Sequence, residues 1–342
     1  MNLDQLMAWA QDKTRFQAPS DYADFCEAYL DFIFDGLQAV IVSQNENHYR
    51  FFQYRKDGNF NVTRPVNSLL FLSQEDFSQT KGEVSYMLQH IRDIRGDRAR
   101  RQLLNRFIYT CQQSIGAALD ALPAGKSNTA RKINGDLFER YIRVILTSIG
   151  ISVHDGVVSV PVEVDGEELF RMSYQHDLIV EADGQLRAIG SVKTSSKDRL
   201  DKIFIDKFLY NKLTNADTPH FAVFLNDVQR KGREPRFGVN TTFLSGHFKG
   251  YTVKLNPLDG VYYCDLRPNM KTDPLLSSQI RSLDHLLTED IWNFVKYNDT
   301  MARRRFFSNL RRAMFILLIL FTNSRPSGWP SRCRRCAPER RR

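Results

Sequence analysis

The feature that most limits what this chain can fold into is a pair of apolar, strand-length runs joined by a tight-turn signal. The runs are Leu178–Glu181 and Leu186–Val192, and Asp183-Gly184 stands between them. An Asp-Gly pair in this setting favours a two-residue hairpin turn, because both central residues of that turn need positive φ angles. We therefore predict an antiparallel hairpin near the middle of the chain.

Helical patterns lie on both sides of this hairpin. Asp136–Ile149 is amphipathic and closed by Gly150, and Asp198–Leu213 forms a second long helix before the apolar strand Phe221–Leu225. The order helix, hairpin, helix, strand predicts an α/β (α+β) core. Further extended segments are predicted at Ile151–Val164 and Leu169–Met172.

The first 122 residues are predicted to be mainly helical, since their apolar residues recur at three- and four-residue steps. The predicted helices are Leu3–Asp12, Tyr22–Val42 and Glu83–Leu122, and two short strands, Tyr49–Tyr54 and Asn59–Thr63, flank Asp57-Gly58. We predict four parts: a helical region at 1–122, a linker at 123–130, the core domain at 131–298 and an Arg-rich tail at 299–342.

The net charge of +9 belongs to the tail. From residue 301 onward the chain has twelve Arg, no Lys and one acid, so this segment carries +11 and residues 1–300 carry −2. Basic surface in the body must come from local clusters, such as Arg92 to Arg106 and Lys193 to Lys212. The tail is either a basic arm for DNA or anionic lipid, or a disordered or frame-shifted end, and we favour the second interpretation.

Cysteine usage and the N-terminus do not match a secreted protein. The five Cys are scattered and odd in number, and no basic segment followed by an apolar one stands at the start. The apolar run in the tail is far shorter than the ~20 residues that span a bilayer. We expect a cytoplasmic protein that does not use a membrane.

Candidate catalytic groups gather around the hairpin. Asp177 stands at the start of its first strand, and Ser191 and Lys193 point to one face of the second. Glu139 lies on the preceding helix. Phosphodiester hydrolysis needs an activated water and neutralised phosphate charge. Carboxylates that hold Mg²⁺, with a lysine nearby, supply both.

Each of these residues also has a plainer interpretation. Glu139 could pair with Arg143 one helical turn on, Asp177 could cap a turn, and Lys193 could be solvated. Their order along the chain favours the catalytic interpretation.

This order resembles the PD-(D/E)xK nuclease superfamily over residues 130–215. The stretch Ser191-Val192-Lys193-Thr194 and the basic turn after it are similar to the S-V-K-T stretches of several type II restriction endonucleases. The resemblance implies a restriction-endonuclease-like core, with a mixed central sheet flanked by helices. His176 stands where the signature has proline, and Ser191 stands where it has the second acid.

Relatives with S-V-K, which recognise sites with a CCGG core, take the missing acid from the following helix, about fourteen residues beyond the lysine. Asp206 lies thirteen beyond Lys193, and position 207 is Lys. Asp206 is therefore our candidate for the displaced acid, with Asp198 and Asp201 as competitors.

The resemblance also implies roles for the site residues. Mg²⁺ would be bound by Asp177, Glu139, Asp206 and the carbonyl of Val192, and Lys193 would orient the attacking water. Basic side chains are expected to contact DNA phosphates or guanine edges. These are Lys197, Arg199, Lys202, Arg230, Lys231 and Arg233.

Taken together, these features predict a Mg²⁺-dependent endonuclease that cuts double-stranded DNA as a homodimer, most simply a sequence-specific type II restriction enzyme. Two alternatives stay open. One is a repair or transposon nuclease on the same core. The other is a DNA-binding module that lost catalysis when the strand acid became Ser191.

Overall fold

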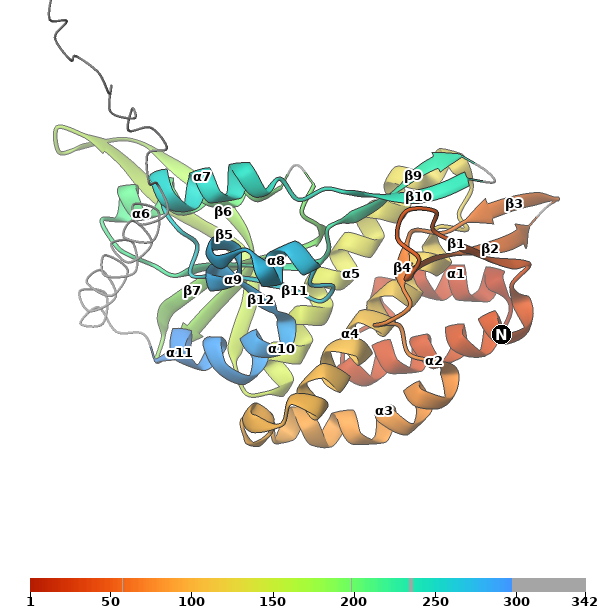
Figure 1. The fold of residues 1–342 in the computed structure, drawn as a ribbon. Helices are drawn as coiled ribbons and strands as arrows, with labels where there is room; N and C mark the ends of the chain where they lie inside the picture. The colour runs from red at the N-terminus through yellow and green to blue at the C-terminus, as the bar shows by residue number, and fades with distance from the viewer. Residues whose placement is uncertain (57, 198, 234–235, 297–342) are drawn as a thin grey trace, which may run out of the picture. The chain divides into compact units, whose positions relative to one another are not determined.

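The predicted hairpin forms strands β6 and β7 of a six-stranded mixed sheet with the strand order β12-β11-β8-β7-β6-β5 (Figure 1). The computed structural model describes residues 1–56, 58–197, 199–233 and 236–296. Strands β5, β6 and β7 are antiparallel neighbours, whereas β7, β8, β11 and β12 run parallel. The strands are β5 (Ser152–Val164), β6 (Glu167–Ala182), β7 (Gln185–Ser195), β8 (His220–Asn226), β11 (Gly260–Tyr263) and β12 (Ile280–Ser282).

Helices cover both faces of this sheet. On one face, Leu178 and Val192 pack in one cluster with Phe138 of α5 (Ser127–Ser148). On the other face, Phe224 packs with Phe204 of α6 (Leu200–Thr214). Alternation along the strands sends successive side chains to opposite layers, so one sheet serves two cores. The predicted mixed sheet flanked by helices is confirmed.

The N-terminal region combines helices with a small antiparallel sheet. Contacts join it to the core in one compact unit, Met1–Tyr297. Its helices are α1 (Leu3–Gln11), η1 (Lys13–Arg15), α2 (Pro19–Gly36), α3 (Gln74–Gln89), η2 (Asp93–Gly96) and α4 (Arg98–Leu119). Its strands are β1 (Ala39–Val42), β2 (Tyr49–Lys56), β3 (Asn59–Val62) and β4 (Val66–Asn67).

Two predicted helices were wrong in extent. The helix predicted at Tyr22–Val42 ends at Gly36, and Val40, Ile41 and Val42 join β1, where β-branched residues fit a pleated surface. The helix predicted at Glu83–Leu122 is broken into α3 and α4 by η2, because Asp97 caps a new start by accepting the amide of Arg100.

Helix α5 begins inside the segment predicted as a linker. It starts at Ser127, after the short η3 (Ala124–Lys126), rather than at Asp136. Ala130 and Asn134 of this added part are buried against the N-terminal region. Residues 127–135 therefore bind the two regions together instead of separating them.

The C-terminal part of the core carries further elements that the sequence patterns did not predict. They are β9 (Val228–Arg233), β10 (Arg236–Thr241), α7 (Ser245–Lys254), α8 (Pro268–Thr272), α9 (Pro274–Gln279), α10 (Leu283–His285), η4 (Leu286–Asp290) and α11 (Ile291–Val295). Across the described part of the chain, no helix is both long and apolar enough to cross a membrane. The predicted tail, 299–342, lies outside the described residues.

Candidate active site

Asp177 lies inside strand β6, not at its start as predicted. The register of β6 on β5 shifts here: Gly156 pairs with His176, and His154 pairs with Ile179. Two residues of β6, Asp177 and Leu178, therefore stand opposite one residue of β5. This is a β-bulge, a feature that turns a side chain out of the regular alternation and is common beside active sites.

Strands β6 and β7 part immediately beyond this bulge. Their pairing ends at Leu178 and Gly190, while β7 stays paired with β8 as far as Ser195. At Gly190 the ring of Phe221 packs so closely that a Cβ would come within 2.5 Å of its Cζ atom. Past the parting point, the amide of Val192 donates to the Asp177 carboxylate at 2.8 Å.

Lys193 joins the two candidate carboxylates. Its Nζ lies 2.6 Å from Asp177 Oδ2 and 2.7 Å from Glu139 Oε1. The side chains of Asp177, Lys193 and Glu139 are 16%, 28% and 29% exposed, so the cluster is sheltered but open to solvent. Arg143, the alternative partner for Glu139, instead pairs with Asp155 at 2.5 Å. The sequence-predicted trio is thus brought together in space.

Burial and mutual charge shape the protonation of the cluster. Burial raises the pKa of Glu139, and the neighbouring charge of Asp177 adds to that effect. For Lys193 burial alone would lower the pKa, but the carboxylates of Asp177 and Glu139 outweigh it and raise the pKa. Lys193 therefore stays an ammonium at neutral pH, so it can donate hydrogen bonds but cannot act as a base.

Asp177 and Glu139 border a cavity of about 220 Å³, whereas Lys193 is not among its lining residues. Its wall includes residues that the sequence patterns missed: Asp136, paired with Lys13 at 2.7 Å, and Asp155, paired with Arg143. Asp136 lies three residues before Glu139 on α5, a spacing that places both on one side of a helix and could have identified it. Lys13 was unpredictable, because it comes from a distant part of the sequence.

The donor set suits a hard divalent cation such as Mg²⁺, which prefers carboxylate oxygens and accepts few protein ligands. Two half-buried carboxylates converge on one cationic group. Asp177 and Glu139 would hold the ion. No group of three or more His, Cys, Asp or Glu among the described residues is spaced to hold a metal.

The predicted displaced acid, Asp206, pairs with Lys202 on the same helix. Its charge acts on the imidazole of His176, next to Asp177, but it is not part of a metal-spaced group. Position 207, where the relatives' spacing places the acid, is a buried Lys that pairs with Asp259 at 2.8 Å. Of the competitors, Asp201 lies in the first turn of α6, and Asp198 lies outside the described residues.

The predicted DNA-contacting residues fall in two places. Lys197 and Arg199 are exposed just before α6, and Lys202 is exposed on it but paired with Asp206. The other three lie on the hairpin β9–β10. Arg230, Lys231 and Arg233 are all exposed there, and Arg230 also donates to the backbone carbonyls of Val62 and Thr63.

Comparisons with known proteins agree with this architecture. No protein-family model and no curated protein matches the chain. Among solved structures, the type IIP restriction endonuclease Kpn2I aligns with a TM-score of 0.64 at 17% identity, over 86% of this chain and 97% of that chain. The restriction endonuclease PspGI, solved with substrate DNA, aligns with a TM-score of 0.37 at 11% identity, over 63% and 92%. At such identities the match to Kpn2I shows the fold, and this chain therefore has a restriction-endonuclease-like fold.

Proposed function

We propose that this protein is a Mg²⁺-dependent endonuclease that hydrolyses phosphodiester bonds in double-stranded DNA. The observation that carries the proposal is the single ammonium of Lys193 held 2.6 Å from Asp177 and 2.7 Å from Glu139. The fold shared with Kpn2I, a type IIP restriction endonuclease, favours this chemistry over others that use paired carboxylates.

In this proposal each residue of the site has a distinct role. Asp177 and Glu139 hold the cation, with the carbonyl of Val192 as a further ligand. The bound Mg²⁺ would lower the pKa of a water and neutralise charge on the phosphate. Lys193, fixed as an ammonium, donates to the attacking water or to a phosphate oxygen. The Val192 amide keeps one oxygen of Asp177 in place and so fixes its orientation.

We further propose a sequence-specific type II restriction enzyme that acts in the cytoplasm as a homodimer. One active site cuts one strand, so a duplex needs two. The exposed Lys197, Arg199, Lys231 and Arg233 offer the positive charge and guanine-binding geometry that such recognition needs.

The test is cleavage of a plasmid of known sequence by the purified full chain, in Mg²⁺ and in EDTA, with mapping of the ends. We expect Mg²⁺-dependent cuts at one repeated sequence, and their loss in Lys193→Met, which keeps the length of the side chain without its charge. Lys132→Met, at an exposed position on α5, is the matched control. Random nicking would contradict specificity, and cutting in EDTA would contradict the metal.

A second candidate is a DNA-binding module without catalysis. The observations that favour it are Ser191 in place of an acid and the absence of a three-residue metal group in the described residues. In that case the wild-type chain binds duplex DNA yet cuts nothing in Mg²⁺.

A further inference from the structure

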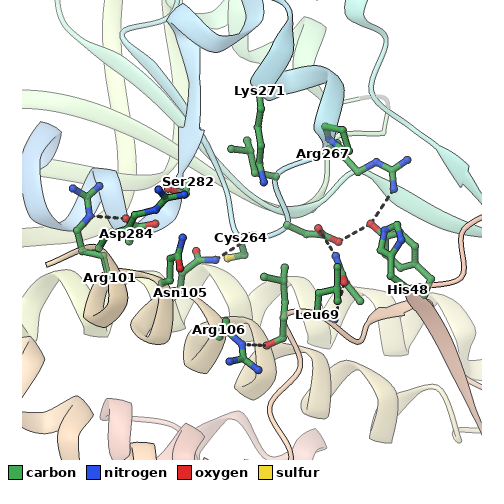
Figure 2. Close-up of a pocket in the computed structure, with 18 of the residues that line it drawn as sticks. His48, Leu69, Arg101, Asn105, Arg106, Cys264, Arg267, Lys271, Ser282 and Asp284 are labelled. Carbon is green, nitrogen blue, oxygen red and sulfur yellow. Dashed lines mark hydrogen bonds and ion pairs between the residues drawn. The ribbon is translucent and has the colours of Figure 1, made fainter.

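A second, larger cavity of about 770 Å³ lies where α4 faces the chain that follows β11 (Figure 2). It shares none of its lining residues with the active-site cavity. Basic residues dominate its wall: they are Arg95, Arg98, Arg101, Arg106, Arg267 and Lys271, against the acids Asp265 and Asp284.

Both acids of this wall already have partners. Asp284 accepts from Arg101 at 2.7 Å. Asp265, only 3% exposed, accepts from the Tyr49 hydroxyl at 2.7 Å and from the Asn67 amide at 2.8 Å. Arg101 therefore balances Asp284, and the charge of Asp265 acts on the neighbouring Arg267.

Three of the cations have no such partner. Arg95 and Arg101 pair with Glu289, and Arg267 pairs with Glu46. Within residues 1–296, as far as they are described, Arg98, Arg106 and Lys271 form no salt bridge with a carboxylate. Lys271 extends from α8 toward α4 (Figure 2), and the Arg106 side chain donates to the Leu70 carbonyl at 3.4 Å.

The start of α4 adds to this unbalanced charge. Its first turn holds Arg98, Arg100 and Arg101 and no acid. The N-terminal end of a helix is itself positive, so cations there are unfavourable and an anion is favourable. Asp97, the N-cap of α4, offsets part of this charge, because it accepts from the Arg100 amide and pairs with the Arg100 guanidinium at 3.7 Å. Arg98 has no carboxylate partner among the described residues, so an anionic ligand beside it would still be favoured.

The cavity also lies at the same edge of the sheet as the candidate active site. Lys193 pairs with Phe224, and Phe224 pairs with Tyr263, so Lys193 and Tyr263 occupy one row across three strands. At ~4.8 Å per strand this row spans about 10 Å. The chain leaves Tyr263 at this edge and leads to Arg267 and Lys271.

We propose that this cavity is a phosphate-ester site, in which Arg98, Arg106 and Lys271 bind the oxyanion. Two sources share that chemistry: the backbone of a DNA strand that continues from the active site, and a free nucleotide. The first source rests on the proposed function, whereas the second does not.

The experiment measures binding without cleavage, on the full chain in EDTA. The probes are inorganic phosphate, dAMP and a 30-base-pair duplex, read by calorimetry and fluorescence anisotropy over a salt series. The variant is Arg98→Gln with Lys271→Gln, both exposed positions. The matched control is Arg100→Gln, which removes a charge from the same turn of α4 but does not line the cavity.

If a free nucleotide is the ligand, dAMP and phosphate bind the wild type, and the double variant binds them at least about tenfold more weakly. If DNA is the ligand, only the duplex affinity falls, and the slope of log affinity against log salt drops by about two. In both cases Arg100→Gln stays within about twofold of the wild type for the probe that the double variant binds more weakly. Equal affinities of the double variant and the wild type for all three probes would overturn the proposal, whether or not the protein cuts DNA.

Discussion

The two cavities of this protein differ in how the charged side chains that line them are paired. Around the active site the acids have cationic partners: Asp136 with Lys13, Asp155 with Arg143, and Glu139 and Asp177 with Lys193. In the cavity beside α4 the acids are also satisfied, yet cations remain. In the active-site cavity a metal cation could take the place of Lys193 beside the carboxylates. In the cavity beside α4 the unpaired cations could bind an anion. This difference is what the two proposals expect, a metal-dependent active site in the first cavity and an anion-binding site in the second.

The largest effect should follow from Asp177→Asn. The amide oxygen can still accept from Val192, but the charge beside Lys193 is lost, so cleavage should fall roughly 10³-fold while duplex affinity stays the same. Plasmid cleavage rates and anisotropy check this, with Asp35→Asn on the exposed side of α2 as control. A variant that cuts at the wild-type rate would show that the Asp177 carboxylate is not needed for cleavage.

The next effect concerns a buried acid behind the second cavity. Arg267 Nε lies 3.6 Å from Asp227 Oδ1, and burial raises the pKa of Asp227 from 3.8 to about 7. A folded-state pKa above the unfolded value contributes stability at low pH that is lost as the pH rises from about 4 to 7.

Asp227→Asn cannot ionise, so at pH 8 it should be more stable than the wild type, by at most roughly 4 kcal/mol. The difference should shrink toward pH 4. Urea unfolding of both proteins at several pH values measures it. A pH-independent difference between them would show that Asp227 keeps an ordinary pKa.

A smaller effect is expected for Lys271→Gln alone. It removes one cation from the second cavity, so duplex affinity should fall about tenfold, while the cleavage rate at saturating DNA stays unchanged. Steady-state kinetics separate the two, and Lys254→Gln at the end of α7 is the control. A lower cleavage rate at saturating DNA would show that Lys271 contributes to the active site as well as to binding.

The smallest effect is a gain of stability. Arg98→Gln relieves cation repulsion at the start of α4, so the free protein should be more stable by about 0.5 kcal/mol in low salt. Thermal unfolding at low and high salt checks this. A loss of stability at both would mean that Arg98 has a packing role.

The sequence predicted those features of the structure that depend on residues close together in the chain, and it missed those that depend on residues far apart. The hairpin, the helices beside it and the meeting of Asp177 with Lys193 followed from local patterns and short separations. The bulge at Asp177 did not, because it depends on the register of β6 on β5, which alternation alone leaves open. The approach of Lys13 to Asp136 also escaped, since nothing local encodes a contact over such a separation.

The same reasoning explains the outcome for α6. Its many apolar residues do not all face the sheet. In the structure Ile205 is 47% exposed and Phe208 is 38% exposed. Hydrophobic residues on a helix do not by themselves reveal which face meets the sheet. The role of Asp206 stays a prediction.

The separation of β6 and β7 beyond Gly190 affects how Asp177 and Lys193 are aligned with each other. Asp177 stands on β6, which pairs with β5, whereas Lys193 stands on β7, which pairs with β8, and the pairing of β6 with β7 ends at Gly190. A methyl group at Gly190 would clash with the ring of Phe221 and change how far β6 and β7 separate. We therefore expect the distance between Asp177 and Lys193 to depend on Gly190, a residue that has no side chain.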